Sequence, residues 1–262
     1  MSHATNQHQK NLLKLIESCR YRYDLWNLWR DARELWALAV SNAVDKRQFD
    51  AREARYLEII GQYDRETQQA FPKMFAELVQ AMEGNFDDVL GQTFMELELS
   101  SKWKGQFFTP YTVAKLMAML TIGEIGPVIE RQGFVTAQEP AVGGGVTVLA
   151  LADAMLEAGY DYQRQLHVTA IDIDATCCHM SYIQFALHYI PAIIVHGDTL
   201  RMEERAHWLT PAHVLGGWEW KLRRQEARPA APEETLPLAL PAITPDVSLP
   251  VRQLSLFEEV LV

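Results

Sequence analysis

The sequence predicts an α/β fold in which a helical N-terminal domain precedes a doubly wound, parallel sheet. Two patterns carry this prediction. Apolar residues among the first hundred positions recur at helical spacings, whereas short β-branched runs alternate with helical segments after about residue 104. The composition agrees, because 262 residues with 48% hydrophobic and 22% charged side chains can bury a sizeable core.

The N-terminal domain is predicted from one amphipathic stripe. Its members recur three, four or seven positions apart: Leu12, Leu15, Cys19, Tyr23, Trp26, Trp29 and Trp36. This spacing favours packing in a core or against a partner helix. The alternative is a stacking surface for nucleic acid, because aromatic and basic residues interleave over residues 20–30. Further helices are expected near residues 47–60 and 70–82, ending near Gly84 and Gly91.

The second half of the chain alternates between strand and helix patterns. Strands are expected over residues 134–138, 167–171 and 193–196, and helices over residues 146–158 and 176–189. This order predicts a parallel sheet with helices on its faces. Ligands of such sheets bind at the carboxyl ends of the strands.

The C-terminal part differs again. Six of the twelve prolines lie between Pro229 and Pro250, in a segment with few aromatic residues, which predicts an extended linker. Apolar residues return after it, as in a docking peptide. The sequence therefore predicts a helical domain (residues 1–100), an α/β domain (101–224), a Pro-rich linker (225–250) and a tail (251–262).

Charge and cysteine content limit the class of protein. The chain has 24 Lys and Arg against 34 Asp and Glu, a net charge of −10, so it cannot hold nucleic acid by phosphate neutralisation alone. Any contact with DNA is expected to need a partner. No apolar run approaches the length of a membrane span, about 20 residues, and the polar start lacks a signal-peptide pattern. The three cysteines, Cys19 and the adjacent Cys177 and Cys178, do not form a disulfide framework. Together these features predict a cytoplasmic protein without disulfides.

A metal site is not expected. The histidines in the second half (His179, His188, His196, His207 and His213) have no metal-ligand spacing, and Cys177 and Cys178 do not form a CxxC pair.

Acidic residues follow each of the three predicted strands. Glu139 opens the segment Glu139-Pro-Ala-Val-Gly-Gly-Gly145, in which glycines allow a ligand to approach the backbone. Position 148 is Val and no Gly-Lys-Ser/Thr follows, so neither a dinucleotide fingerprint nor a Walker loop fits. Asp172 can accept hydrogen bonds from both hydroxyls of a ribose, and Asp198 lies at the next strand end. Such a series suits a nucleoside with a cationic end, such as S-adenosylmethionine.

Four motifs carry a family resemblance: Gly105-Gln-Phe-Phe-Thr-Pro-Tyr-Thr-Val-Ala114, Glu139-Pro-Ala-Val-Gly-Gly-Gly145, Ala170-Ile-Asp-Ile-Asp174 and His196-Gly-Asp-Thr-Leu200. In this order they resemble the cofactor motifs of adenine-N6 DNA methyltransferases that serve as modification subunits of type I restriction systems. The resemblance implies a Rossmann-like sheet that binds S-adenosylmethionine, and DNA adenine methylation. The implied cofactor-binding residues are Phe107, Thr109, Pro110, Glu139, Ala141, Gly143, Gly145, Asp172, Ile173, Asp198 and Thr199.

One family motif is missing. These enzymes have an Asn/Asp-Pro-Pro-Tyr/Phe loop that grips and stacks the flipped target base. The nearest segment here is Thr210-Pro-Ala-His213, and residues 203–208 before it form a poor strand pattern. Catalytic residues are therefore unassigned. The alternative to an active methyltransferase is a catalytically silent adaptor that keeps the fold and acts through a partner.

The tail contains a second resemblance. Gln253-Leu-Ser-Leu-Phe257 is similar to the pentapeptide by which bacterial proteins bind the DNA polymerase sliding clamp (its β subunit). This implies polar contacts by Gln253, with Leu254, Leu256 and Phe257 as apolar contacts. The alternative is that the tail packs on its own domain. A clamp-binding protein is expected in a bacterium, or on a mobile element such as a phage or plasmid.

Overall fold

The computed structural model describes residues 6–84, 86–99 and 109–227 of the chain. Two compact units divide the chain, Met1–Gln225 and Glu226–Val262, and the second lies almost wholly outside the described residues. The predicted clamp-binding residues and Phe107 are also outside them.

The first part of the chain is helical, as predicted. Its elements are α1 (Gln7–Ser18), α2 (Leu25–Val44), the short 3-10 helix η1 (Lys46–Gln48), α3 (Phe49–Ile60), α4 (Arg65–Met82) and α5 (Val89–Leu99). Helix α2 begins after Asp24, whose carboxylate accepts a 2.9 Å hydrogen bond from the Asn27 N–H. Trp29 and Trp36 are buried, so the aromatic stripe is core packing.

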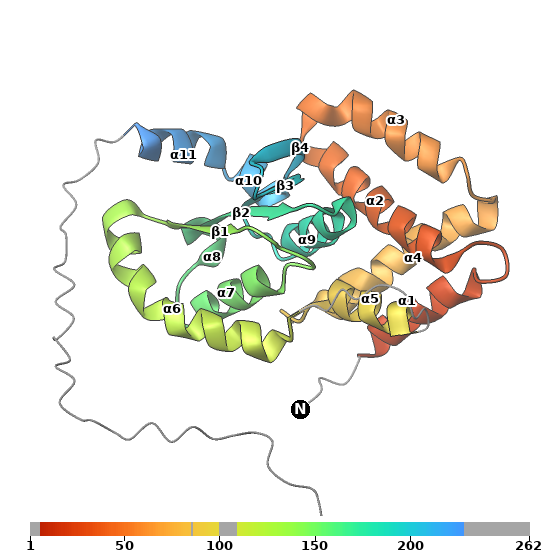
Figure 1. Ribbon diagram of the computed structural model, residues 1–262, viewed down its shortest axis with the longest axis horizontal. Coiled ribbons are helices and arrows are strands. Elements are labelled where there is room, and N and C mark those ends of the chain that lie inside the picture. The colour runs from red at the N-terminus through yellow and green to blue at the C-terminus, as the bar shows by residue number, and fades with distance from the viewer. Residues whose placement is uncertain (1–5, 85, 100–108, 228–262) are drawn as a thin grey trace, which may run out of the picture. The chain divides into compact units, whose positions relative to one another are not determined.

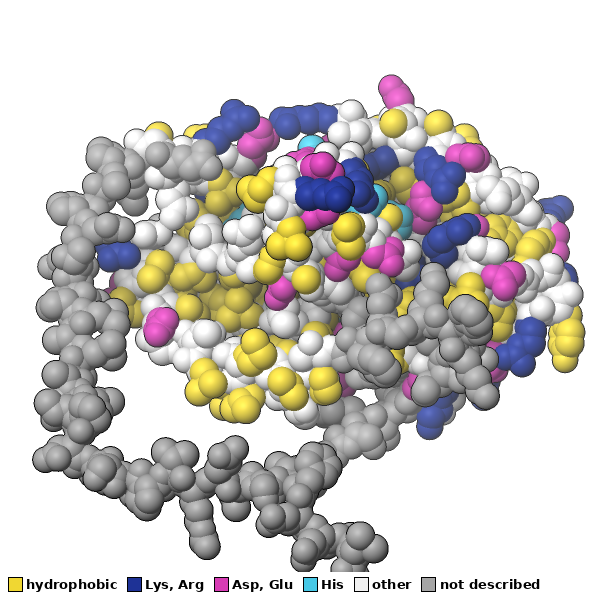
Figure 2. Space-filling model, in the orientation of Figure 1, with side chains coloured by type: hydrophobic (Ala, Val, Ile, Leu, Met, Phe, Trp, Pro, Cys, Tyr) yellow, Lys and Arg dark blue, Asp and Glu magenta, His cyan; other side chains and the backbone are white. Residues whose placement is uncertain are grey.

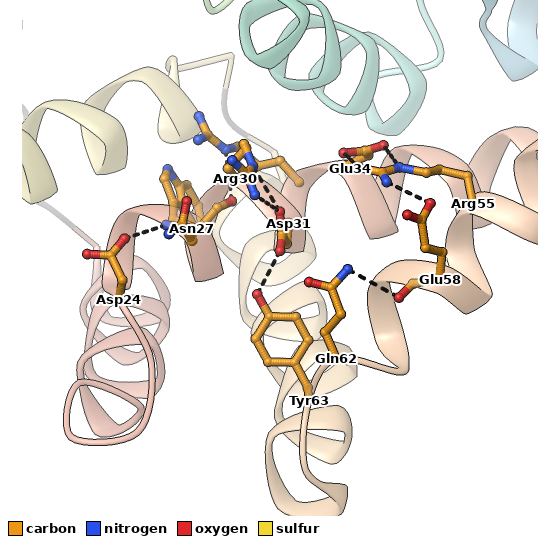
Figure 3. A network of polar contacts seen from close by, with 11 residues as sticks. Asp24, Asn27, Arg30, Asp31, Glu34, Arg55, Glu58, Gln62 and Tyr63 are labelled. Carbon is orange, nitrogen blue, oxygen red and sulfur yellow. Dashed lines mark hydrogen bonds and ion pairs between the residues drawn. The ribbon is translucent and has the colours of Figure 1, made fainter.

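A polar network joins α2 to α3 and to the turn before α4 (Figure 3). The buried carboxylate of Asp31 accepts a 2.8 Å hydrogen bond from the Tyr63 hydroxyl and pairs with Arg30 at 2.8 Å. One helical turn later, Glu34 pairs with Arg55 at 2.6 Å. The carboxylates of Asp31 and Glu34 are therefore both paired, so burying them between the helices leaves neither without a partner.

The helix boundary predicted at Gly91 is wrong, because Gly91 lies in the first turn of α5. Its N–H donates a 2.8 Å hydrogen bond to Asp88, which precedes the helix. A side chain at position 91 would lie 2.0 Å from that carboxylate. The glycine therefore lies at the start of a helix, where the lack of a side chain lets the Asp88 carboxylate cap its N–H group.

The second part of the chain forms a four-stranded sheet in the order β1-β2-β3-β4. The predicted β-strands and helices are confirmed within one or a few residues: β1 (Val135–Glu139), α7 (Val146–Glu157), β2 (Leu166–Asp172), α9 (Ala175–Leu187) and β3 (Ala192–Asp198), with the short α8 (Tyr162–Gln165) before β2. The first three strands are parallel. Their carboxyl ends therefore lie along one edge.

The fourth strand, β4 (Glu203–Leu209), differs from the prediction, which rejected a strand here. It pairs antiparallel with β3, from Asp198 opposite Glu203 to Ile193 opposite Leu209. Its first four residues are exposed and Trp208 is buried, so it lacks the apolar alternation of a half-buried strand. Charged residues are typical of strands at a sheet edge, which are held by main-chain pairing.

Helices cover both faces of the sheet (Figure 1). Helices α7 and α9 lie on one face, with α6 (Tyr111–Gln132) beside α7; α10 (Pro211–Leu215) and α11 (Trp218–Glu226) lie on the other. Side chains of the helical part and of the sheet belong to one hydrophobic core, in which Trp29, Leu149, Phe185 and Ile194 are all buried. The fold class is thus confirmed, with a mixed sheet in place of a wholly parallel one.

Helix α6 is apolar on both faces. Ala114 and Ala118 pack against α7, whereas Leu116, Met117 and Leu120 are exposed; yellow side chains mark this helix along the lower edge of Figure 2. An 18-residue window has a mean hydropathy of 1.4 and is 17% buried. The expectation that no apolar segment reaches membrane-span length is therefore wrong for α6, although one such helix is weak support for a membrane protein.

Candidate functional site

The loop between β1 and α7 carries three consecutive glycines with separate structural roles. Gly143 and Gly145 have positive φ angles of 52° and 100°, which favour glycine. A Cβ on Gly145 would also lie 2.6 Å from the ring of Phe185 on α9. The loop is therefore folded tightly against α9, and its shape is fixed by packing within the chain.

Gly144 is held by a buried polar pair that was not predicted from the sequence. The Gln184 side-chain amide donates to the Asp88 carboxylate at 2.8 Å and to the Gly144 carbonyl at 2.5 Å. Burial raises the pKa of Asp88 above its usual range. The available signal was Gln184 itself, a polar residue inside the apolar run of α9. These contacts position the glycine loop from two directions.

Asp172 ends β2 and faces the glycine loop. Its two carboxylate oxygens accept 2.8 Å and 2.9 Å hydrogen bonds from the N–H groups of Gly143 and Asp174. A carboxylate has about four lone-pair sites, so each oxygen can accept a further bond. Asp172 is thus held rigidly by the backbone and retains capacity for two hydroxyl donors.

The end of β3 is joined to the same loop. The Thr199 hydroxyl donates a 2.7 Å hydrogen bond to the carbonyl of Pro140. Asp198 accepts bonds from the N–H groups of Leu200 and Arg201, which closes the turn before β4. The Thr199 bond places the end of β3 beside the loop after β1, as predicted from the positions of both segments at the ends of parallel strands.

Two more predicted residues line this edge. Glu139 is tied to its own loop, because its oxygens accept from the Thr147 hydroxyl at 2.8 Å and from the Ala141 N–H at 3.2 Å. Ile173 is 58% exposed, and its carbonyl lies 3.2 Å from the His196 ring. The edge therefore offers carboxylates beside the exposed apolar side chain of Ile173.

The segment predicted to lie near the cofactor before α6 is placed only in part. Thr109 and Pro110 are exposed, and Pro110 is the residue before the first turn of α6. This helix is fixed to α7, where Lys115 pairs with Asp153 at 2.5 Å. Among the described residues, no hydrogen bond joins Thr109 or Pro110 to the three strand ends.

The segment from Thr210 to His213 cannot replace the missing catalytic loop. Because β4 runs antiparallel, its C-terminal end lies at the start of β3, away from Asp198. Thr210 is buried there, with its hydroxyl bonded to the Ile190 carbonyl at 2.8 Å and accepting from the Ala192 N–H at 2.9 Å. His213 is buried and lies 2.9 Å from His167. Both side chains are used in packing at the opposite edge of the sheet.

The chain is similar to known proteins in sequence and in structure. Residues 85–215, half of the chain, match the profile of the N-6 DNA methylase family. No curated protein matches the chain. It is similar to a solved class I S-adenosylmethionine-dependent methyltransferase of Listeria monocytogenes, with 15% identity and a TM-score of 0.42, over 74% of this chain and 55% of that one. It thus spans about half the length of that structure. By its match over residues 85–215, the chain belongs to the N-6 DNA methylase family.

Proposed function

We propose that the protein binds S-adenosylmethionine at the carboxyl ends of β1, β2 and β3 and methylates adenine N6 in DNA. The observation that carries the proposal is the Asp172 carboxylate, fixed by two backbone N–H groups and still able to accept two hydrogen bonds. The two hydroxyls of a ribose match that capacity. Membership in the N-6 DNA methylase family supports the choice of cofactor and target.

The other residues of the edge fit the remaining parts of this cofactor. In this proposal Asp198, Thr199 and the exposed Ile173 would contact the adenine. The loop residues Glu139, Ala141, Gly143 and Gly145 would hold the amino-acid and sulfonium part, and Phe107, Thr109 and Pro110 would flank the methionine chain. When bound, the cofactor supplies a methyl carbon that is electrophilic because it is attached to a sulfonium. Carboxylates near that centre are favoured by its positive charge.

A second candidate function is a catalytically silent adaptor. It is favoured by the absence of an Asn/Asp-Pro-Pro-Tyr/Phe sequence and by the position of Thr210 and His213 at the far edge of the sheet. In this proposal the cofactor site is retained, and the protein acts by assembling with a partner. The two candidates differ in methyl transfer but agree on cofactor binding.

We also propose that the tail tethers the protein to the bacterial sliding clamp through Gln253, Leu254, Leu256 and Phe257. The support is the pentapeptide at residues 253–257 after a Pro-rich segment. A clamp that encircles DNA would raise the effective concentration of this acidic chain near its substrate. DNA contact would then depend partly on the partner.

Calorimetry with S-adenosylmethionine, followed by a methyl-transfer assay on duplex DNA with and without the clamp, tests these proposals. Saturable binding with methylation supports the enzyme, and binding without methylation supports the adaptor. If the cofactor does not bind at all, the proposed cofactor site is wrong for both.

A further inference from the structure

A cavity of about 550 Å³ lies at the opposite edge of the sheet from the candidate cofactor site. Its apolar floor includes Leu209 and Val214. Its walls come from the segment after α2, with Lys46 and Arg47, and from α11, with Glu219, Trp220 and Arg223. Cavities of this size hold ligands as large as a nucleotide.

The mouth of the cavity is basic, although the chain as a whole is acidic. Lys46, Arg47 and Arg223 all line it and are exposed, and dark-blue side chains mark the upper rim of the molecule in Figure 2. Glu219 pairs with Arg47 at 3.2 Å and with Arg223 at 2.8 Å. Because the other acidic lining residue, Asp45, is paired with Arg52, the mouth holds three cations and one further carboxylate; Lys46 itself donates to the Asn42 carbonyl at 2.7 Å.

Glu219 holds the two arginines on either side of the cavity. Each guanidinium uses one nitrogen for this contact, and a guanidinium has five N–H donors. Both arginine side chains remain 75% exposed. Exposed ion pairs of this kind contribute little to stability, so the pairing of Glu219 with both arginines is not explained by stabilisation of the fold. The paired arginines are instead well placed to bind a phosphate in two-point contact.

Trp220 adds an aromatic surface beside these cations. Its side chain lines the cavity and is 63% exposed, so part of its ring is open to a ligand. The Arg224 guanidinium lies 5.2 Å from its ring centroid. Aromatic rings in a basic groove stack the bases of single-stranded nucleic acid.

We propose that this cavity binds one nucleotide of a single DNA strand, with the base stacked on Trp220 and its phosphate between Arg47 and Arg223. A single strand is required because the faces of bases in a duplex are covered by their neighbours. The proposal rests on the proposed function in taking DNA as the nucleic acid. The cavity is nevertheless separate from the cofactor site, since the five residue steps from Ile193 to Asp198 span about 17 Å.

The test is binding of a fluorescently labelled oligothymidine of about ten nucleotides to the full-length protein, followed by fluorescence anisotropy at low salt. Trp220→Ala and the double variant Arg47→Gln/Arg223→Gln should each weaken binding about tenfold or more. The double variant should also lower the slope of log affinity against log salt by about 0.7 per lost phosphate contact. Matched controls are Tyr21→Ala, an exposed aromatic residue, and Arg65→Gln, an exposed cation, both on the helical part.

Two outcomes would overturn the proposal: wild-type affinity in both cavity variants, or binding of a duplex but not of the single strand. The result is independent of the cofactor. Asp172→Ala should bind the oligonucleotide as the wild type does, and Trp220→Ala should keep wild-type calorimetry with S-adenosylmethionine. If the cofactor proposal fails, the oligonucleotide test can therefore still succeed. If the oligonucleotide test fails, the cofactor proposal can still hold.

Discussion

The side chain of Gln184 on α9 donates a 2.8 Å hydrogen bond to the carboxylate of Asp88, 96 positions earlier in the chain. Both residues are buried, and the same amide also contacts the carbonyl of Gly144. One side chain thus joins the helical part, the sheet layer and the glycine loop. Its loss should affect stability and the loop together.

Gln184→Leu should destabilise the protein by about 1–3 kcal/mol, because it leaves the buried Asp88 carboxyl group without its amide partner. Urea unfolding followed by circular dichroism measures this. Asp88→Asn is the matched comparison, since its side-chain oxygen can still accept from Gln184 and Gly91. It should cost clearly less than Gln184→Leu. A Gln184→Leu variant within 0.5 kcal/mol of the wild type would contradict this role.

Stability should fall as the pH is lowered below about 6.5, partly because of His179. Burial lowers the pKa of this histidine to about 4, whereas an unfolded histidine titrates near 6.5. The unfolded state therefore takes up the proton first as the pH falls, and this favours unfolding between pH 6.5 and 4. Between pH 7.5 and 5, His179 should contribute a loss of about 2 kcal/mol.

His179→Phe isolates that contribution, because phenylalanine cannot be protonated. Urea unfolding of the wild type and the variant at pH 7.5 and 5 should show a smaller pH effect in the variant, whatever its stability at pH 7.5. Equal pH effects in the two proteins would show that His179 does not carry this dependence.

Asp172→Ala should remove most of the affinity for S-adenosylmethionine. A hydrogen bond to a carboxylate is worth about 1.5–3 kcal/mol, so loss of two to a ribose predicts a decrease of a hundredfold or more. Calorimetry measures the affinity, and a thermal melt checks that the loop still folds without the Gly143 contact. Asp161→Asn, at an exposed position before α8, is the control and should bind normally. Equal affinity of Asp172→Ala and the wild type would overturn the ribose assignment.

Clamp binding should reside in the tail. Leu256→Ala/Phe257→Ala should weaken it about a hundredfold or more, because each anchor contributes about 1.5–3 kcal/mol when fully buried. Leu261→Ala, another leucine of the tail outside the pentapeptide, should bind nearly normally. Surface plasmon resonance with the immobilised clamp measures both, and the free peptide of residues 251–262 should compete.

Packing of the tail on its own domain predicts different measurements. If the tail packs on its own domain, deletion of residues 251–262 lowers the melting temperature, and the free peptide does not bind the clamp. If it is a docking peptide, the same deletion leaves the melting temperature and cofactor affinity unchanged.

The strands β2 and β3 could be predicted because burial dictates their composition. Val168, Ala170 and Ile194 are fully buried, so the apolar runs are visible in the sequence. Strand β4 could not be found in this way. Its residues Glu203 to Arg205 face solvent, and its pairing with β3 uses main-chain groups that any sequence supplies.

In the candidate site, too, some residues could be predicted from the sequence and others could not. Asp172 and Asp198 were predictable because each ends a strand, and parallel strands bring their ends together. The contact of Gln184 with Asp88 depends on folding of distant segments, and so does the meeting of Arg47 with Arg223 around Glu219. A net charge of −10 conceals that local excess of cations, since it averages over the whole surface.

Helix α6 has a consequence for the behaviour of the protein in solution. Leu116, Met117 and Leu120 expose more than half of their side-chain surface on one stretch of this helix, and Leu120 reaches 75%. Water in contact with such a surface favours self-association as concentration rises. Sulfate strengthens apolar burial, so it should lower the solubility limit of this protein more than chloride at the same ionic strength. A charged residue at position 120 would reduce that adhesion without disturbing the face of α6 that packs on α7.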